Sequence, residues 1–342
     1  MRKIHLLPAD ERALFFNEAF NETKIPFNMI EKDYWVVWTL ERLFALDDLK
    51  DHLTFKGGTS LSKVYGIIER FSEDIDVSIE REFLGFGDDK NPEKAPSRNK
   101  RHAMLEALSK ACADYVQNKM AVDLRKGIAE VLGTTKGWQL VVDTTDPDAQ
   151  TLNFEYPSLS PKDGYIRPFV KIEMGARSEH WPVSQHKIRS YVKDALKEKV
   201  HEDEVVVRVL NAERTFWEKA TILHQYAHLP ETKEMPLRIS RHFYDFFRLL
   251  NSDIKKKALS DVTLLERVAS NKAIYFASGW ASYATARKGT LKLSPLPRIL
   301  GDLERDYYLM KQMFFGEIPD WQLILKTIEQ FETDFNLEAA HR

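Results

Sequence analysis

Two aspartates separated by a single residue, Asp74 and Asp76, are the side chains in this sequence best suited to binding a metal ion. Apolar and polar residues alternate from Ile75 to Glu80, which predicts a β-strand, and alternate residues of a strand point to one face. Both carboxylates therefore lie on the same side of the predicted strand. Two negative charges so close together need a counterion, and Mg²⁺ or Mn²⁺ would suit these oxygen ligands. The alternative is a solvated strand edge, where the two charges have no chemical role.

A glycine pair lies upstream, in Gly57-Gly58-Thr59-Ser60. Glycines let a backbone approach a ligand closely, and a helix that begins here would point unpaired N–H groups at an anion. Thr59 and Ser60 add hydroxyl groups, and Lys63 adds a cation. The segment lacks the Gly-x4-Gly-Lys-Ser/Thr spacing of a P-loop. It predicts a phosphate-binding turn, with an ordinary tight connection between a strand and a helix as the alternative.

A third carboxylate, Glu173, lies on another predicted strand, 166–174, on the same face as Lys171. If this strand lies beside Asp74 and Asp76, three acids could hold two metal ions. Phosphoryl transfer requires groups that hold a triphosphate and cations that neutralise the attacking and leaving oxygens. The glycine turn and the carboxylates together therefore predict a metal-dependent transfer of a nucleoside monophosphate from a nucleoside triphosphate, with release of pyrophosphate.

The elements that must position these residues follow from the hydrophobic pattern. Apolar residues recur at helical spacing in 10–20, 28–46, 59–71 and 101–131, whereas β-type runs occupy 52–55, 75–80, 138–143, 150–156 and 166–174. Residues 85–100 are rich in Gly, Pro and charge and predict a surface loop. After Arg177 the pattern is mostly helical, including 184–199, 211–228, 238–252 and 319–335. We therefore expect an α+β fold, with a mixed β-sheet core flanked by helices in residues 1–180 and a mostly helical domain in residues 181–342.

Composition limits the possible classes of protein. The 342 residues are 43% hydrophobic, which is enough for one large core or two smaller ones. The 50 basic and 52 acidic residues nearly cancel, so no global charge would hold the protein on nucleic acid or an anionic membrane. The one cysteine, Cys112, excludes an intramolecular disulfide and a cysteine-based zinc site. Without an apolar signal or membrane segment, the expected location is the cytoplasm.

The run GGTSLSKVYGIIERFSEDIDVSIE, which begins at Gly57, resembles the core of the AbiEii/AbiGii-type nucleotidyltransferase toxins of the DNA polymerase β-like superfamily. The likeness extends upstream to Glu31-Lys32-Asp33-Tyr34-Trp35, and downstream to Glu213–Lys219 and Arg241–Asp245. It covers about residues 25–250 and implies that the mixed sheet is a nucleotidyltransferase core. The charged residues Glu31, Lys32 and Asp33 would either support the metal site through its neighbours or form a solvated helix face.

The resemblance implies a role for each motif. Gly57, Gly58 and Thr59 would face the triphosphate, Asp74 and Asp76 would hold metal, Lys219 would contact a nucleotide phosphate, and Asp245 would be the last essential acid. The third strand carboxylate varies in position within the family, so Asp143 or Glu155 could replace Glu173. His242 stands where many members have Lys or Arg. Without the resemblance, the segments around Lys219 and Asp245 are ordinary amphipathic helices.

The resemblance further implies a toxin of a type IV toxin–antitoxin or phage-defence system. Such a toxin would add nucleotides to RNA, for example at the tRNA 3′ end, and would be restrained by a separately encoded antitoxin. Basic residues that could contact an acceptor are Arg98, Lys100, Arg101, His102, Arg177, Lys187 and Arg189. Two alternatives remain: a nucleotidyltransferase that modifies a Tyr, Ser or Thr hydroxyl of a protein, and a catalytically silent module that binds nucleotide or a partner.

Overall fold

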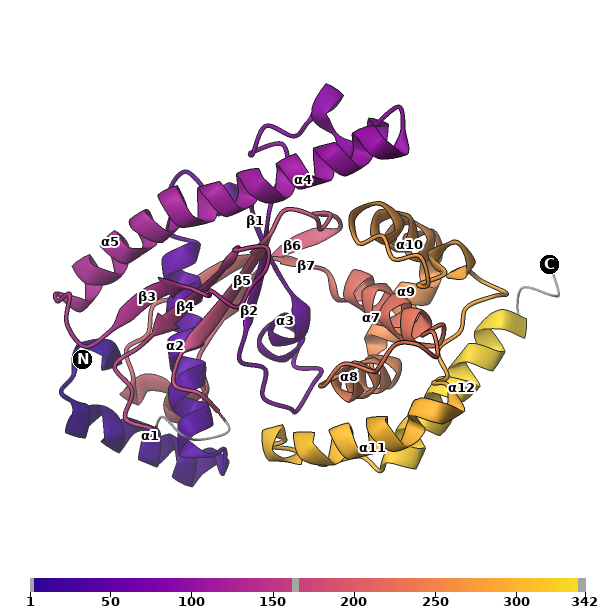
Figure 1. Ribbon diagram of the computed structural model, residues 1–342. Coiled ribbons are helices and arrows are strands. Elements are labelled where there is room, and N and C mark those ends of the chain that lie inside the picture. Colours follow the sequence, from indigo (N-terminus) through magenta and orange to yellow (C-terminus); the bar gives the residue numbers. More distant parts are fainter. Residues whose placement is uncertain (1–2, 162–165, 338–342) are drawn as a thin grey trace. The chain divides into compact units, whose positions relative to one another are not determined.

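The chain forms two compact units in a computed structural model that describes residues 3–161 and 166–337. The first unit comprises Met1–Val64 and Phe71–Val209, and the second comprises Tyr65–Arg70 and Leu210–Arg342. Figure 1 shows the elements of each unit. The short segment Tyr65–Arg70 thus belongs with the second unit, although both of its neighbours in sequence belong to the first.

A mixed β-sheet, seven-stranded in the part of the chain that the structure describes, forms the centre of the first unit. Along the sheet the strand order is β3-β4-β5-β2-β1-β7-β6. β2 is antiparallel to β1 and parallel to β5, β1 is parallel to β7, and β4 is antiparallel to β3 and β5. The strands are β1 (Leu53–Lys56), β2 (Ile75–Ile79), β3 (Gln139–Val142), β4 (Thr151–Glu155), β5 (Val170–Gly175), β6 (Val183–Ile188) and β7 (Val205–Leu210). The predicted mixed sheet is confirmed, and β1 to β5 match the predicted strands.

The strands β6 and β7 were not predicted, and the helix predicted over 184–199 is wrong except for the short α6 (Tyr191–Leu196). β6 lies at one end of the sheet order and most of its side chains are partly or fully exposed. Because such a strand buries little surface, its sequence carries only a weak alternation. β7, with the run VVVRVL, has the β-branched composition of a buried strand. Since both strands extend the sheet, the first unit continues to Val209, whereas the sequence placed the boundary near residue 180.

Helix α2 (Phe27–Leu43) covers one face of this sheet and is buried throughout residues 29–40. Trp35 stacks on Tyr156 with ring centroids 5.4 Å apart, and Trp38 stacks on Phe154 at 5.6 Å. The strand residues on this face are apolar and buried, as Ile75, Val77, Ile172 and Phe154 illustrate. By the alternation of strands, the intervening polar residues point to the opposite face.

The other helices of the first unit surround the sheet (Figure 1). They are α1 (Ala9–Thr23), α3 (Gly57–Lys63), α4 (Arg98–Tyr115), α5 (Ala121–Leu132) and α6. The helix predicted over 101–131 is confirmed, with a π-helical turn at Val116–Met120 between α4 and α5. The helix predicted over 59–71 is shorter than expected, because α3 ends at Lys63 and Gly66 then adopts a left-handed φ of 60°.

The second unit is helical. Its helices are α7 (Ala212–Tyr226), α8 (Ser240–Leu250), α9 (Asp253–Ser260), α10 (Thr263–Tyr275), α11 (Leu300–Leu309) and α12 (Trp321–Leu337). The helices predicted over 211–228, 238–252 and 319–335 are confirmed as α7, α8 and α12. Phe216, Phe246 and Phe331 join these three helices in a core, with ring centroids 4.8 to 5.7 Å apart.

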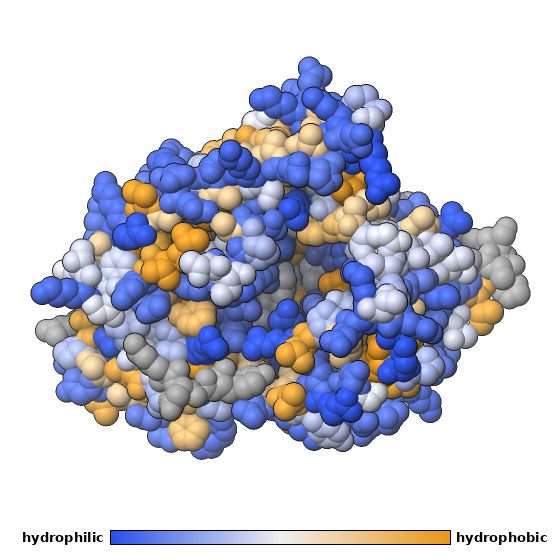
Figure 2. Space-filling view, in the orientation of Figure 1, coloured by the Kyte–Doolittle hydropathy of each residue, from blue (hydrophilic) through white to orange (hydrophobic). Residues whose placement is uncertain are grey.

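Large apolar side chains that are exposed come from many different elements of the chain. Figure 2 shows a face that is mostly hydrophilic, with hydrophobic residues in small groups. Exposed apolar side chains such as Leu14 and Leu237 are ordinary on a protein surface. Within residues 3–161 and 166–337, none of the helices has both the length and the apolar character that a bilayer-spanning helix requires.

Candidate active site

The three predicted metal-binding carboxylates lie on the polar face of the sheet. Asp76 on β2 is in register with Lys56 on β1 and with Glu173 on β5. Residues in register on adjacent strands project to the same side, so Asp76 and Glu173 are neighbours on this face. Asp74 immediately precedes β2 and shares the face by alternation. The expected adjacency of the β2 carboxylates and Glu173 is therefore present in the backbone register.

The glycine turn packs directly against one of these carboxylates. Gly57 begins α3 with a φ of 80°, a conformation that side chains other than glycine rarely adopt. A Cβ atom built on Gly57 would lie 2.0 Å from Asp76 Oδ2 and 2.7 Å from its Cγ. Only a residue without a side chain fits this position. The structure thus brings Gly57 and Asp76 together, as the spacing of the two motifs predicted.

The hydroxyl groups of Thr59 and Ser60 hold the turn together. Thr59 Oγ1 lies 2.5 Å from the backbone oxygen of Asp74, to which it donates, and 3.0 Å from Ser72 Oγ. Ser60 Oγ donates to the backbone oxygen of Gly57 over 2.8 Å. Both residues have no exposed surface. These hydroxyls therefore form hydrogen bonds within the protein instead of the predicted contact with a nucleotide. The backbone N–H groups of the turn are the remaining candidates for binding a phosphate.

Lys63 is likewise engaged inside the protein. Its Nζ lies 2.8 Å from Asp33 Oδ1 and 3.9 Å from the centroid of the Tyr191 ring. The Lys63 and Asp33 side chains are only 4% and 3% exposed. Asp33 also accepts a 2.6 Å hydrogen bond from the backbone nitrogen of Tyr191, at the start of α6. In this conformation Lys63 joins α3 to α2 and α6 and is not presented to a phosphate, contrary to the predicted role.

Glu31 and Lys32, the two residues before Asp33, also bond to groups inside the protein. The alternative that Glu31, Lys32 and Asp33 form a solvated helix face is therefore wrong. Glu31 accepts hydrogen bonds from the backbone nitrogens of Leu159, at 2.6 Å, and Ser160, at 3.1 Å. Lys32 Nζ lies 2.6 Å from Glu73 Oε2 and 2.9 Å from the backbone oxygen of Arg167. All three charges are buried in α2, where a charged group requires such partners. Through Glu73, this helix holds the residue next to Asp74.

Glu173 is paired with a lysine on its own strand. Lys171 Nζ lies 2.6 Å from Glu173 Oε1. Partial burial alone would lower the pKa of Lys171, but the hydrogen bond to Glu173 and the charges of Glu173, Asp74 and Asp143 raise it. The ammonium group therefore sits among the acids. In this arrangement no three His, Cys, Asp or Glu side chains of the described residues are grouped as a metal site.

The two alternatives for the third carboxylate lie elsewhere on the sheet. Asp143 follows β3 and accepts hydrogen bonds from the side chain and the backbone nitrogen of Thr145, which lower its pKa. Glu155 on β4 is in register with Gln139 on β3. Of the three candidates, Glu173 is the one in direct register with Asp76.

The remaining predicted residues, Lys219 and Asp245, meet in the second unit. Asp245 on α8 is fully buried, and Lys219 Nζ of α7 lies 2.7 Å from its Oδ2. Arg70 forms a two-pronged ion pair with the same carboxylate, with Nε 2.7 Å from Oδ1 and Nη2 2.8 Å from Oδ2. The sequence analysis missed Arg70, because its partner is 175 positions away and no local pattern indicates it.

This buried cluster has one anion and two cations. Burial opposes the charge of Asp245, but the adjacent Arg70 and Lys219 lower its pKa far below the ordinary range. Burial also lowers the pKa of Lys219, with Arg70 contributing in the same direction. His242, 3.1 Å from Lys219 Nζ through its Nδ1, has a pKa well below its ordinary value because of burial and the charge of Lys219. His242 is therefore neutral and accepts from Lys219, so it supplies no cation here.

Comparison with known proteins adds a family. A family model described as "Nucleotidyl transferase AbiEii toxin, Type IV TA system" matches residues 38–335. Among solved structures, MenT4, a nucleotidyltransferase toxin from Mycobacterium tuberculosis H37Rv, is similar at 16% identity, with 96% of this chain and 98% of that chain covered and a TM-score of 0.46. No curated protein matches the sequence. The family match includes residues of both compact units.

Proposed function

Because the chain belongs to the AbiEii nucleotidyltransferase toxin family of type IV toxin–antitoxin systems, we propose that it uses a divalent metal to transfer a nucleoside monophosphate from a nucleoside triphosphate to RNA, at the 3′ end of tRNA. The observation that carries this proposal is the arrangement of Gly57, Asp76 and Glu173. Gly57, at a position that admits only glycine, packs on the carboxylate of Asp76. Asp76 is in register with a second acidic residue, Glu173. An antitoxin encoded separately would restrain the activity.

Asp74, Asp76 and Glu173 would hold Mg²⁺ or Mn²⁺. Their donor set fits such an ion, since hard divalent cations prefer carboxylate oxygens. Glu173 would join once its ion pair with Lys171 opens, which leaves Lys171 free to neutralise charge nearby. The chemistry that a bound divalent ion supplies is neutralisation of the triphosphate and of the attacking oxygen.

The reaction itself is a displacement at the α-phosphate. The acceptor hydroxyl loses its proton to solvent, its oxygen forms a bond to the α-phosphorus, the bond from that phosphorus to the oxygen bridging to the β-phosphate breaks, and pyrophosphate leaves. The backbone N–H groups at Gly57 and Gly58 would hold the triphosphate at the start of α3. We keep for Lys219 the role of contacting a nucleotide phosphate and for Asp245 that of an essential acid, on the likeness of their motifs.

The proposal is tested with purified protein, Mg²⁺, each labelled nucleoside triphosphate in turn, and total cellular RNA or total cellular protein. We expect label on tRNA with the wild type and none with Asp76→Asn, which keeps the shape of the side chain. Glu106→Gln on α4 is the matched control, since this carboxylate is 70% exposed and lies outside the site. Label on protein alone would support the protein-hydroxyl alternative, and triphosphate binding without any labelled product would support the silent module. Unchanged transfer by Asp76→Asn would refute the metal-binding role.

A further inference from the structure

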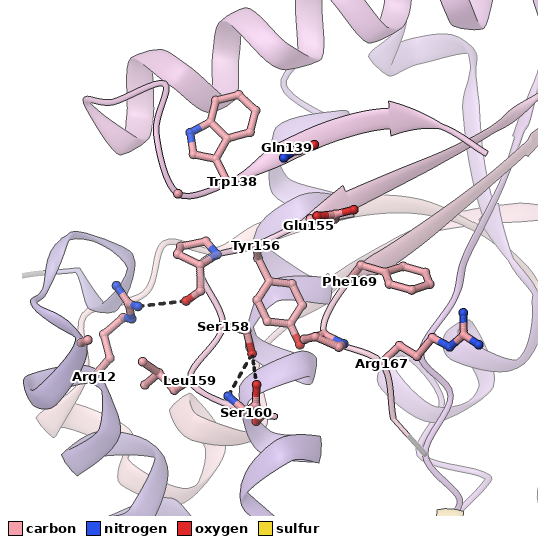
Figure 3. A pocket seen from close by; sticks show the side chains of 14 residues that line it. Arg12, Trp138, Gln139, Glu155, Tyr156, Ser158, Leu159, Ser160, Arg167 and Phe169 are labelled. Carbon is pink, nitrogen blue, oxygen red and sulfur yellow. Dashed lines mark hydrogen bonds between the residues drawn. The ribbon is translucent and has the colours of Figure 1, made fainter. Parts of the chain in front are cut away.

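A cavity of about 660 Å³ opens in the first unit; Asp74, Asp76, Glu173 and the glycine turn do not line it, whereas Glu155, the alternative that is not in register with Asp76, does. It lies where β3 begins and β4 ends, and is formed mainly by residues 137–139, 155–160 and 167–169, with Arg12 of α1 (Figure 3). Its volume is in the range of cavities that enclose a small organic ligand. The cavity can therefore hold a group as large as a nucleotide.

The lining combines aromatic rings with polar groups. Phe169 contributes a partly exposed ring, backed by the buried rings of Trp138 and Tyr156, while the exposed side chains of Gln139 and Glu155 contribute hydrogen-bonding groups. Rings on which a base can stack, beside side chains that can bond to its edge, are typical of sites for unpaired nucleotides. The lining thus suits a nucleobase better than an aliphatic or uniformly charged ligand.

Two arginines add positive charge to the cavity. In the view of Figure 3, Arg167 lies beside Phe169 on one side and Arg12 lies on the other. Arg12 is nearly buried and donates to the backbone oxygens of Leu7, at 3.1 Å, and Pro157, at 2.9 Å. Arg167 has an exposed side chain. Because Arg12 is held by these backbone oxygens and interacts with the buried Glu31 carboxylate, the exposed Arg167 guanidinium is the group available to an anionic ligand such as a phosphodiester.

The register of the sheet relates this cavity to the acidic face. On β4 and β5, Thr151 is in register with Glu173 and Asn153 with Lys171. Glu155 is the next residue of β4 on the same face, so it shares that face with Glu173 and Asp76. Glu155 lies four positions along β4 from Thr151, a distance of about 13 Å at the usual rise per residue. At this distance Glu155 cannot bind the same metal ion as Glu173. A bound RNA strand whose end reaches Glu173 could nevertheless place one of its other nucleotides at Glu155.

We propose that this cavity binds an unpaired nucleotide of the RNA acceptor, close to the 3′ end that reacts. The inference rests on the proposed function and adds the place where the acceptor strand is held. The base stacks on Phe169, Gln139 and Glu155 bond to its edge, and Arg167 contacts the backbone phosphate. The incoming nucleoside triphosphate is not the ligand here, because its phosphates are required at carboxylates on the neighbouring strands, more than about 13 Å away.

The test uses the full chain with single substitutions of exposed lining side chains. Arg167→Ala and Gln139→Ala should each raise the KM for tRNA about tenfold, because a charged hydrogen bond to a phosphate and a hydrogen-bonded base contact each contribute roughly that factor or more. The kcat at saturating tRNA and the KM for the nucleoside triphosphate should stay at the wild-type values. Arg167→Lys should recover part of the loss, since it restores the charge but not the planar group. Lys136→Ala is the matched control, since Lys136 is exposed and close in sequence but does not line the cavity.

Binding is also measured directly, by fluorescence anisotropy of a labelled oligoribonucleotide that matches the tRNA 3′ end, without triphosphate. The same two variants should weaken this binding and Lys136→Ala should not. An unchanged KM for tRNA in both variants, an equal effect of Lys136→Ala, or a rise in the KM for the triphosphate instead would overturn the inference while the proposed function stands. A wild type that neither labels nor binds RNA would overturn both.

Discussion

Replacing Asp245 by asparagine should cost the second unit a large part of its stability. The wild-type carboxylate has no exposed surface and balances the cations of Arg70 and Lys219, at 2.7 to 2.8 Å. Asparagine keeps the shape but removes the charge, so two buried cations remain without an anion. Leaving a buried charge unpaired costs about 3–5 kcal/mol, so we expect the free energy of unfolding to fall by about that amount.

The pH dependence of this loss identifies its cause. Burial already lowers the pKa of Lys219 in the wild type, and without the carboxylate its pKa falls further. A lysine with a lowered pKa in the folded state makes folding more favourable as pH rises from that pKa to the unfolded value of about 10.4. The difference in the free energy of unfolding between the wild type and Asp245→Asn should therefore become smaller between pH 7 and pH 10.

The measurement is urea unfolding followed by tryptophan fluorescence at pH 7 and at pH 9.5, for the wild type, Asp245→Asn, Arg70→Met and the double variant. Arg70 and Asp245 are in direct contact, so their effects should be non-additive by roughly 1–3 kcal/mol. If Asp245→Asn lowers the free energy of unfolding by less than about 1 kcal/mol at pH 7, or if the effects of the two substitutions are additive, the three side chains do not form a buried ion network.

Three further outcomes are expected. Gly57→Ala should abolish nucleotide transfer, because the added Cβ would displace the Asp76 carboxylate. Gly66 also has a positive φ, but no atom lies within 4 Å of the position of its Cβ. Gly66→Ala should therefore only lower the free energy of unfolding, by about 1–3 kcal/mol. Lys63→Met should lower the unfolding temperature but leave the KM for the triphosphate near the wild-type value, since the ammonium group is held inside the protein. A large rise in that KM would mean that Lys63 does contact a phosphate, as the sequence predicted. Lys171→Met should lower the Mn²⁺ concentration that gives half-maximal transfer, because the neighbouring carboxylate no longer has to leave an ion pair; an unchanged or higher requirement contradicts this.

Parts of the fold that depend on local pattern were predicted correctly. The alternation from Ile75 identified β2 and placed Asp74 and Asp76 on one face, and helical spacing identified α2, α7, α8 and α12. The strand β6 was missed because an edge strand buries few side chains and leaves little alternation to detect. The end of α3 was misplaced because the apolar spacing continues through Tyr65 and Ile68, although those residues belong to the other unit.

The sequence alone determined which residue types are present at the candidate site and which local element carries each, because the periods of strands and helices are set by the backbone over a few residues. Only the tertiary structure decided which of Glu173, Asp143 and Glu155 lies beside Asp76, since strand pairing joins segments far apart in the chain. It likewise decided the partners of the buried charges, giving Lys63 to Asp33 and Arg70 to Asp245. A buried charge must find its partner wherever packing places one, and no spacing along the chain records that choice.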